Sequence, residues 1–168
     1  LHPTARSLLT GGQAEQTIMW THPLGVSCKS RLDYISDKYV VDLKTTKSVS
    51  KREFANSAAF YQYYAQLSFY TQAAKAMDGI ERQAVIVAVE KDPPYDVVPY
   101  VLPQEAMDAG NALIRDWMIE LMKCETSGKW PGVSDEPTEL QLPSWCFSEW
   151  DDAHVVVPDS EKGDASAL

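Results

Sequence analysis

Residues 26–46, VSCKSRLDYISDKYVVDLKTT, decide the fold of this 168-residue chain. Two runs rich in β-branched and aromatic residues, Val26–Ser36 and Lys38–Thr45, flank a short polar corner, which is typical of a β-hairpin. A third run, Glu15–Trp20, precedes them and is separated from them by a turn that contains Pro and Gly. The stretch therefore predicts a three-stranded meander.

The rest of the chain alternates helix and strand patterns. We expect the end of a helix at 3–10, a helix over 50–77 with a break near 56–57, strands at 82–90 and 96–102, and a helix over 103–124. This order predicts one α/β domain over residues 1–150, with a central mixed sheet flanked by helices, and an acidic, disordered tail at 151–168. The helix face that packs on the sheet is predicted to carry Phe60, Tyr64, Leu67, Thr71 and Ala74.

Charge is distributed unevenly along the chain. The sequence has 15 Lys and Arg against 24 Asp and Glu, a net charge of −9, which by itself argues against a nucleic-acid partner. However, residues 1–134 hold 14 basic and 15 acidic side chains, whereas residues 135–168 hold one basic and nine acidic ones. Residues 29–52 hold seven basic side chains against three Asp, so the predicted hairpin favours DNA locally.

Composition excludes several classes of protein. Hydrophobic residues make up 45% of the chain, which is enough for a core, and no apolar run reaches the roughly 20 residues of a membrane span. The three cysteines form no CxxC or Cys/His pattern and no signal peptide is present, so we expect a cytoplasmic protein without a disulfide framework or zinc site. Because the chain begins at Leu1, we expect a fragment or a processed chain.

The predicted hairpin brings two carboxylates together. A two-residue turn at its polar corner sets Asp33 directly opposite Asp42, with Cβ atoms roughly 4.5–5.5 Å apart. Two like charges at this distance destabilise the pair unless a cation binds between them. Oxygen ligands suit Mg²⁺ or Mn²⁺, so the pattern predicts a metal site; a solvated cross-strand ion pair is the plainer alternative.

Basic side chains extend this prediction. Lys44 lies two residues after Asp42, so their side chains are expected on the same face of the strand. There, Lys44 can hold or help deprotonate an attacking water. Lys29 and Arg31 are expected on the same face, where they can meet phosphate oxygens. The opposite face of the hairpin is apolar and is expected to pack on helices. It consists of Leu32, Tyr34, Val41 and Leu43.

These residues resemble the PD-(D/E)XK nuclease superfamily, and within it the exodeoxyribonuclease VIII (RecE-like) exonucleases of phages and prophages. The resemblance implies a restriction-endonuclease-like core in which Asp33, Asp42 and the Leu43 backbone carbonyl bind Mg²⁺ and Lys44 assists the attacking water. It covers about residues 2–146. It rests on GVSCKSRLDYISDKYVVDLKTTKSV at 25–49, YYAQLSFYTQA at 63–73, AVIVAVEKDPPYDV at 84–97, and GKWP and LQLPSW between 128 and 145.

The resemblance also implies further site residues. Glu15 and His2 are candidate additional metal ligands, with solvated surface positions as the alternative. Gln66 and Tyr70 form a Q-x-x-x-Y pattern on one helix face, which implies contacts to phosphate or to Lys44; ordinary helix packing is the alternative. Further DNA contacts are expected from Thr45, Thr46 and Lys47.

The resemblance implies a function as well. It predicts degradation of linear double-stranded DNA from its ends, one strand being digested from 5′ to 3′, during phage-type recombination. It also predicts a ring-shaped homo-oligomer, a RecT-like single-strand annealing partner, and further N-terminal helices that are missing here. Two alternatives remain open: a RecB- or Cas4-like repair nuclease, and a catalytically inactive DNA-binding or assembly module.

Overall fold

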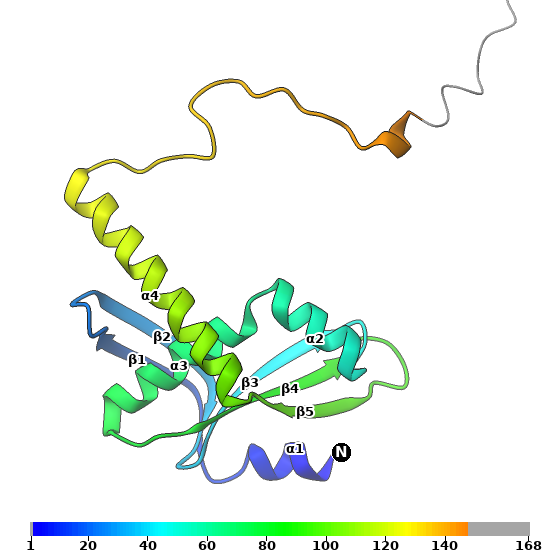
Figure 1. The fold of residues 1–168 in the computed structure, drawn as a ribbon. Helices are drawn as coiled ribbons and strands as arrows, with labels where there is room; N and C mark the ends of the chain where they lie inside the picture. Colours follow the sequence, from blue (N-terminus) through cyan, green and yellow to red (C-terminus); the bar gives the residue numbers. More distant parts are fainter. Residues whose placement is uncertain (1, 148–168) are drawn as a thin grey trace, which may run out of the picture. The chain divides into compact units, whose positions relative to one another are not determined.

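The structure is a computed structural model, and it describes residues 2–147 (Figure 1). The chain divides into two compact units, Leu1–Lys129 and Trp130–Leu168. In its described part, the second unit contains one short 3₁₀ helix, η1 (Ser144–Cys146). The expected boundary at residue 150 and the expected tail at 151–168 lie outside the described residues. None of the described helices combines the length and apolarity that a membrane crossing needs.

The first unit is built on one mixed sheet with the strand order β1-β2-β3-β4-β5. The antiparallel meander consists of β1 (Gln13–Thr21), β2 (Ser27–Ile35) and β3 (Tyr39–Thr46). Next, β4 (Gln83–Glu90) runs parallel to β3, and β5 (Val97–Val101) returns antiparallel. The predicted α/β fold class is confirmed, and every predicted strand agrees with the observed one to within two residues.

The parallel step from β3 to β4 needs a long crossover, because both strands start from the same end of the sheet. Two helices, α2 (Lys51–Phe60) and α3 (Tyr63–Asp78), form this connection. The helix predicted over residues 50–77 is therefore divided, and its break lies at Tyr61 and Gln62 rather than at 56–57. Gln62 has the left-handed φ of 54°, which interrupts the helix.

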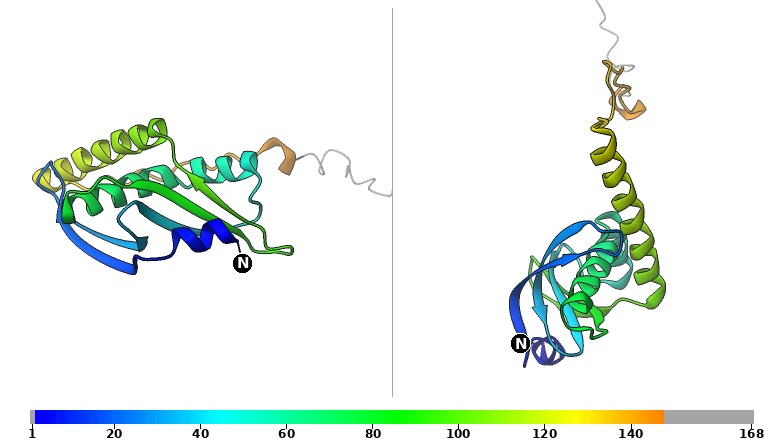
Figure 2. Two further views of the ribbon diagram at one scale, coloured as in Figure 1. Left: turned by 90° about the horizontal axis from the view of Figure 1, so that it is seen from below. Right: turned by 90° about the vertical axis from the view of Figure 1, so that its left-hand side faces the viewer.

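Helices cover both faces of the sheet (Figures 1 and 2). On one face α1 (Pro3–Leu8) packs through Ala5 into a cluster with Val41. On the other face α3 packs against a cluster that includes Val40, the neighbour of Val41 on β3. A last helix, α4 (Gln104–Ser127), lies on α3. Their close approach requires Gly110, because a Cβ there would lie 2.3 Å from Ser68 Oγ.

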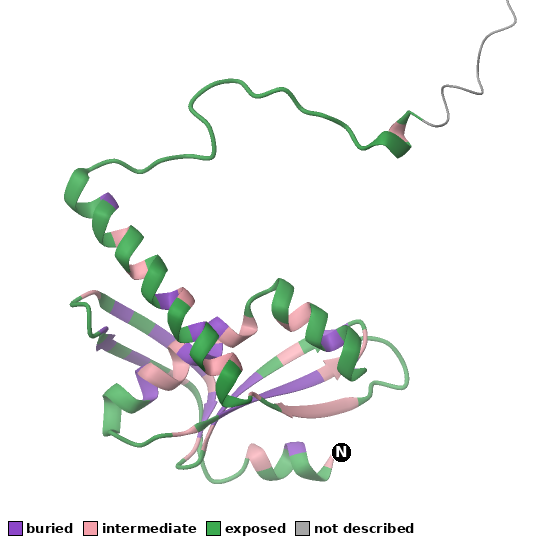
Figure 3. Cartoon of the chain, viewed as in Figure 1, coloured by how far each residue is buried: buried purple, intermediate pink, exposed green. Residues whose placement is uncertain are grey.

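Burial follows the strands and the inner side of α3 (Figure 3). Leu67 and Ala74 are fully buried, as the predicted helix face requires. Phe60, predicted on the same face, is 80% exposed. The break after Phe60 interrupts the helix. Residues spaced by three or four positions across it therefore do not lie on the same helix face.

The predicted apolar face of the hairpin is wrong. Leu32 packs in the cluster beneath α3, Tyr34 and Val41 pack in the cluster beneath α1, and Leu43 is 47% exposed. In a regular strand Leu32 and Tyr34 would lie on the same face. On β2, Ile35 lies on the face of Leu32 and Tyr34 on the other face, so the alternation of side chains is broken at Asp33. The opposite position on β1, Glu15, has a φ of 53°. The two strands therefore kink together beside the predicted site.

Candidate active site

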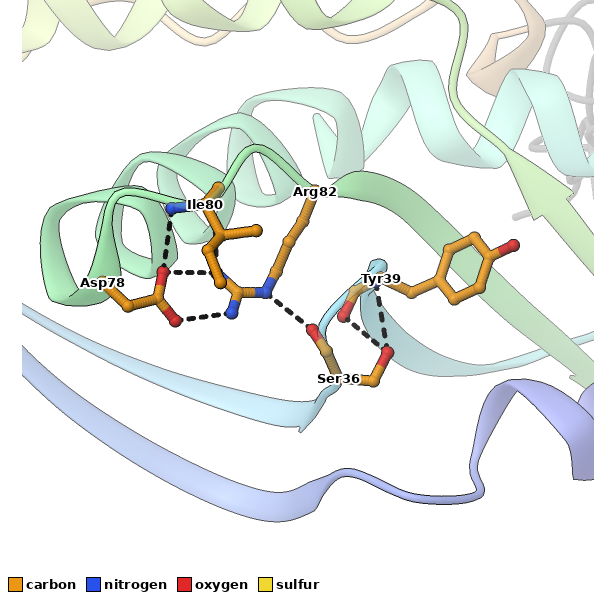
Figure 4. A network of polar contacts seen from close by, with 5 residues as sticks. All are labelled: Ser36, Tyr39, Asp78, Ile80 and Arg82. Carbon is orange, nitrogen blue, oxygen red and sulfur yellow. Dashed lines mark hydrogen bonds and ion pairs between the residues drawn. The ribbon is translucent and has the colours of Figure 1, made fainter.

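The turn end of the β2–β3 hairpin is closed by hydrogen bonds (Figure 4). Ser36 N–H donates to the Tyr39 carbonyl at 2.9 Å, and Tyr39 N–H donates to Ser36 Oγ at 3.2 Å. From the start of β4, Arg82 Nε donates to the Ser36 carbonyl at 2.6 Å. The two terminal nitrogens of Arg82 donate to the Asp78 carboxylate at 2.8 and 2.5 Å. This network ties the end of α3 and the start of β4 to the turn.

The other end of the hairpin is open. Tyr34 pairs with Val41 and Ile35 with Val40, a register that sets Asp33 opposite Asp42 as predicted. If the ladder continued, the backbone of Leu43 would be hydrogen-bonded to the backbone of Leu32. Instead, Leu43 N–H donates to the side chain of Asp33, at Oδ2, over 2.8 Å. Because the N–H and C=O of one strand residue point the same way, the Leu43 carbonyl faces the same gap.

Asp42, the residue before Leu43 on β3, is almost completely buried, with 1% of its side chain exposed. Burial raises the pKa of Asp42; the neighbouring Lys44 ammonium opposes this rise, and the charge of Asp33 adds to it. Lys44 Nζ lies 2.6 Å from Asp42 Oδ2, so both side chains point to one side of β3, as predicted. The Lys44 ammonium is the partner of Oδ2 in an ion pair, and this oxygen accepts no further hydrogen bond from the described residues.

This donor set fits a divalent cation. Burial of the Asp42 carboxylate is costly even with its single lysine partner, and a cation between the carboxylates of Asp33 and Asp42 would offset this cost. Mg²⁺ commonly takes one or two carboxylates and leaves positions for water and substrate phosphate. The Leu43 carbonyl is a third hard oxygen at the same gap. Within residues 2–147, however, no group of three or more His, Cys, Asp and Glu side chains is arranged to hold a metal.

Two predicted ligands are engaged elsewhere. Glu15 Oε2 accepts a hydrogen bond from Arg31 Nε at 2.7 Å, in an exposed ion pair across β1 and β2. His2 Nδ1 accepts from Ala5 N–H at 3.2 Å and so caps α1. The structure does not bring either side chain into a ligand group with Asp33 and Asp42.

The predicted helix motif forms a pair of its own. Gln66 Nε2 donates to Tyr70 Oη at 3.1 Å, and both residues are half-buried on α3. In the described part of the chain, neither is hydrogen-bonded to Lys44. Their predicted contacts to phosphate remain a prediction, because the pair itself shows only that the Gln66 amide is oriented.

The predicted shared face of the basic side chains is wrong. Leu32 on β2 and Val40 on β3 pack in the cluster beneath α3, so alternation puts Asp42 and Lys44 on the α3 side of the sheet and Lys29 and Arg31 on the opposite side. Lys29 and Arg31 are exposed and alternate with buried residues of β2. The ion pair with Glu15 offsets much of the charge of Arg31 at this surface. The predicted contacts of Lys29 and Arg31 to phosphate stay a prediction.

A pocket of about 500 Å³ borders the site at the end of β3. The loop after β3 forms part of its wall. Two hydrogen bonds hold this loop to the end of β4: Lys91 N–H donates to the Thr46 carbonyl at 3.0 Å, and Val49 N–H donates to Glu90 Oε1 at 2.9 Å. The predicted DNA contacts Thr45, Thr46 and Lys47 all line it. The other lining residues are Ser48, Glu53, Ser57, Tyr61, Tyr63 and Lys91.

The sequence analysis missed Tyr63, Tyr61 and Lys91. The Tyr63 ring lies under the Lys44 ammonium, with 4.9 Å between Nζ and the ring centroid, which is a cation–π distance. The aromatic run at 60–64 was the available signal, but helical periodicity assigns such residues to the core. Only the break at Gln62 turns them toward the pocket.

Comparison with solved structures supports the fold. The chain is similar to a protein from Eubacterium rectale described as a "Putative exonuclease", with a TM-score of 0.65 and 16% sequence identity. The similarity covers 85% of this chain and 59% of that one, so the chain spans about three fifths of that protein's length. The structure of SSO0001 matches with a TM-score of 0.38 and 19% identity, over 66% of this chain and 54% of the other, and carries no weight.

Comparison with protein families covers most of the chain. No curated protein matches it. Residues 2–141 match the family described as "PDDEXK-like domain of unknown function (DUF3799)". The matched range includes the mixed sheet, both carboxylates of the open hairpin end and Lys44. The chain therefore belongs to this PDDEXK-like family of the PD-(D/E)XK nuclease superfamily.

Proposed function

We propose that the protein is a Mg²⁺-dependent exodeoxyribonuclease that degrades linear double-stranded DNA from its ends. One observation carries the proposal: the Asp42 carboxylate is almost completely buried beside Asp33 and Lys44, and burial raises its pKa in spite of the Lys44 ammonium. Perturbed ionisable groups of this kind gather at functional sites. Mn²⁺ has the same ligand preference and is expected to replace Mg²⁺.

Each residue of the open hairpin end has a distinct task in this proposal. Asp33 and Asp42 would hold the cation together with the Leu43 carbonyl. When bound, the cation would lower the pKa of a water and polarise the scissile phosphate. Asp33 also fixes the backbone of Leu43 through the 2.8 Å hydrogen bond. Lys44, held by Asp42 and by the Tyr63 ring, is placed to orient the attacking water and to meet charge on the phosphate.

The preference for DNA ends rests on resemblance. The likeness to RecE-like enzymes favours an exonuclease that digests from 5′ to 3′, and the name of the Eubacterium rectale protein agrees with an exonuclease. A ring-shaped homo-oligomer and a RecT-like annealing partner belong to the same proposal. Light scattering tests the first, because a monomeric mass in the presence of DNA would contradict it.

The decisive assay compares linear duplexes labelled at either the 5′ or the 3′ end with closed circular DNA of the same sequence. We expect Mg²⁺-dependent release of nucleotides from the linear substrates, starting at the 5′ end, and intact circles. Asp37→Asn is the matched control, since Asp37 is an exposed carboxylate at the turn of the same hairpin. Cutting of closed circles would indicate an endonuclease instead, and DNA binding without cutting would indicate a binding module.

A further inference from the structure

Three aromatic rings line up at the junction of α2 and α3. The rings of Phe60 and Tyr61 meet edge to face, with centroids 5.0 Å apart. The rings of Tyr61 and Tyr63 are stacked, with centroids 5.7 Å apart and an interplanar angle of 17°. Phe60 is 80% and Tyr61 63% exposed, although large apolar surfaces are normally buried. We refer to Phe60, Tyr61 and Tyr63 as the aromatic ladder.

The backbone between the rings makes this arrangement. In a continuous helix, residues two positions apart point about 200° away from each other. Gln62 adopts φ 54° and ψ 38°, a left-handed conformation that L side chains other than Asn and Asp rarely adopt. This residue interrupts the helical phase between the two rings, and Tyr61 and Tyr63 stack side by side. Strained backbone of this kind is found where the local geometry serves a function.

The inner end of the aromatic ladder is anchored in the core and reaches the site. The ring of Tyr63 lies 6.3 Å from that of Phe54, which stacks on Tyr100 at 5.0 Å. The other neighbour of Tyr63 is the Lys44 ammonium, 4.9 Å from the ring centroid. The ladder therefore runs without interruption from solvent to the candidate catalytic lysine.

The charge around the aromatic ladder indicates what it binds. The pocket beside it is lined by Lys47 and Lys91 against one acidic side chain, Glu53, and by the hydroxyl groups of Thr45 and Ser57. Rings for stacking beside cations for phosphates are the combination by which proteins hold single-stranded nucleic acid. Bases inside a duplex present only their edges, so an aromatic face can stack only on unpaired bases or on a terminal pair.

We propose that the aromatic ladder is a stacking platform for the unpaired bases at a DNA end, and that it guides the strand end toward Lys44. The proposal rests on the proposed nuclease function and adds the part of the substrate that is recognised. Stacking on aromatic rings is tolerant of base sequence. The ladder therefore suits an enzyme that must process any DNA end.

Binding without cleavage tests the proposal. The probes are a fluorescent duplex with a three-nucleotide single-stranded overhang at each strand polarity and the corresponding blunt duplex, measured by anisotropy in Ca²⁺ or EDTA. We expect the Phe60→Ala, Tyr61→Ala double variant to bind the overhang substrate about tenfold or more weakly, with blunt-duplex affinity within about twofold of wild type. Tyr61→Phe keeps the ring and is expected to bind like wild type.

Controls separate the possible failures. Trp117→Ala removes a comparably exposed aromatic side chain from α4 and is expected to change neither affinity. A 2-aminopurine placed in the overhang should be quenched on binding to wild type and not on binding to the double variant. If the double variant bound the overhang with wild-type affinity, the stacking role of the aromatic ladder would be overturned and the nuclease proposal would stand.

If the wild type did not bind DNA, the nuclease proposal itself would be overturned. A change of oligomeric mass in the double variant would show that the rings join two copies, which also overturns the ladder.

Discussion

At the closed end of the β2–β3 hairpin, Asp78 receives two hydrogen bonds from Arg82, and the guanidinium lowers the pKa of Asp78 to about 2. At the open end, Asp42 is paired with Lys44, yet burial raises the pKa of Asp42. Both carboxylates have a cation within 3 Å. Their pKa values shift in opposite directions for two reasons. Asp78 accepts two parallel hydrogen bonds from the Arg82 guanidinium and remains partly exposed. Asp42 has only the Lys44 ammonium as its partner and is almost completely buried.

The difference shows which pair serves the fold and which serves the site. A satisfied ion pair that holds a turn stabilises the native state. A buried carboxylate whose desolvation outweighs its one ion pair destabilises it, unless a ligand completes the site. The closed end of the hairpin therefore serves stability and the open end serves activity. Substitutions at the closed end should lower stability and leave activity, and those at the open end should do the reverse.

The largest effect is expected for Asp42→Asn. The amide cannot hold a divalent cation as a carboxylate does, so Mg²⁺-dependent cleavage should fall by about a thousandfold. An uncharged amide is easier to bury, whereas Lys44 loses its partner, so these opposing effects should keep the thermal midpoint within about 5 °C of wild type. Initial cleavage rates and calorimetric unfolding measure the two properties. A midpoint lowered by more than about 5 °C would mean that the Asp42–Lys44 pair serves the fold after all.

The opposite pattern is expected for Arg82→Met. The Ser36 carbonyl loses its bond from Arg82 and the Asp78 carboxylate keeps only that from Ile80 N–H, so the thermal midpoint should fall by roughly 5 °C. The cleavage rate per folded molecule, measured well below the midpoint, should stay within about threefold of wild type. Arg82→Lys keeps the charge without the fork and should give an intermediate midpoint. An unchanged midpoint in Arg82→Met would remove the stabilising role of the closed end.

A smaller effect is expected from pH. The pKa of Asp78 in the folded protein is about 2, below the roughly 3.9 of an unfolded aspartate. Its contribution to stability is therefore fully present above the unfolded pKa and is lost as the pH falls through about 2. Urea unfolding of wild type and Asp78→Asn from pH 6 to pH 2 checks this. The difference in unfolding free energy should be constant above about pH 5 and shrink toward pH 2; an equal difference at both limits contradicts it.

The smallest effect is expected for Glu15→Gln. Glu15 lies on the kinked strand next to the open end, but its carboxylate is exposed and paired with Arg31. Exposed ion pairs contribute little, so the thermal midpoint should change by about 1 °C or less and the cleavage rate by less than about threefold. A loss of a hundredfold or more would place Glu15 among the metal ligands, as the sequence resemblance implied.

The sequence predicts the sheet well because the hairpin signals are local. The polar corner at Asp37 and Lys38 sets the register that brings Asp33 opposite Asp42, and the alternation along β3 places Lys44 beside Asp42. The same alternation fails on β2, because the kink at Asp33 is a tertiary feature shared with the neighbouring strand.

The burial of Phe60 was wrongly predicted for a related reason. Helical periodicity assumes a continuous helix, and the left-handed Gln62 is not signalled by any Gly or Pro at that point. Phe60 therefore appeared to belong to the core although it is exposed. Burial of Asp42 could not be predicted either, because it depends on helices that are distant in the sequence.

Calorimetric titration of the protein with Mn²⁺ tests the central claim most directly, since it does not depend on the substrate. The wild type and the turn control Asp37→Asn should give the same binding heat, and Asp33→Asn and Asp42→Asn should lose it while unfolding within about 5 °C of the wild-type midpoint. Undiminished binding heat in Asp42→Asn would contradict the assignment of the open hairpin end as the metal centre.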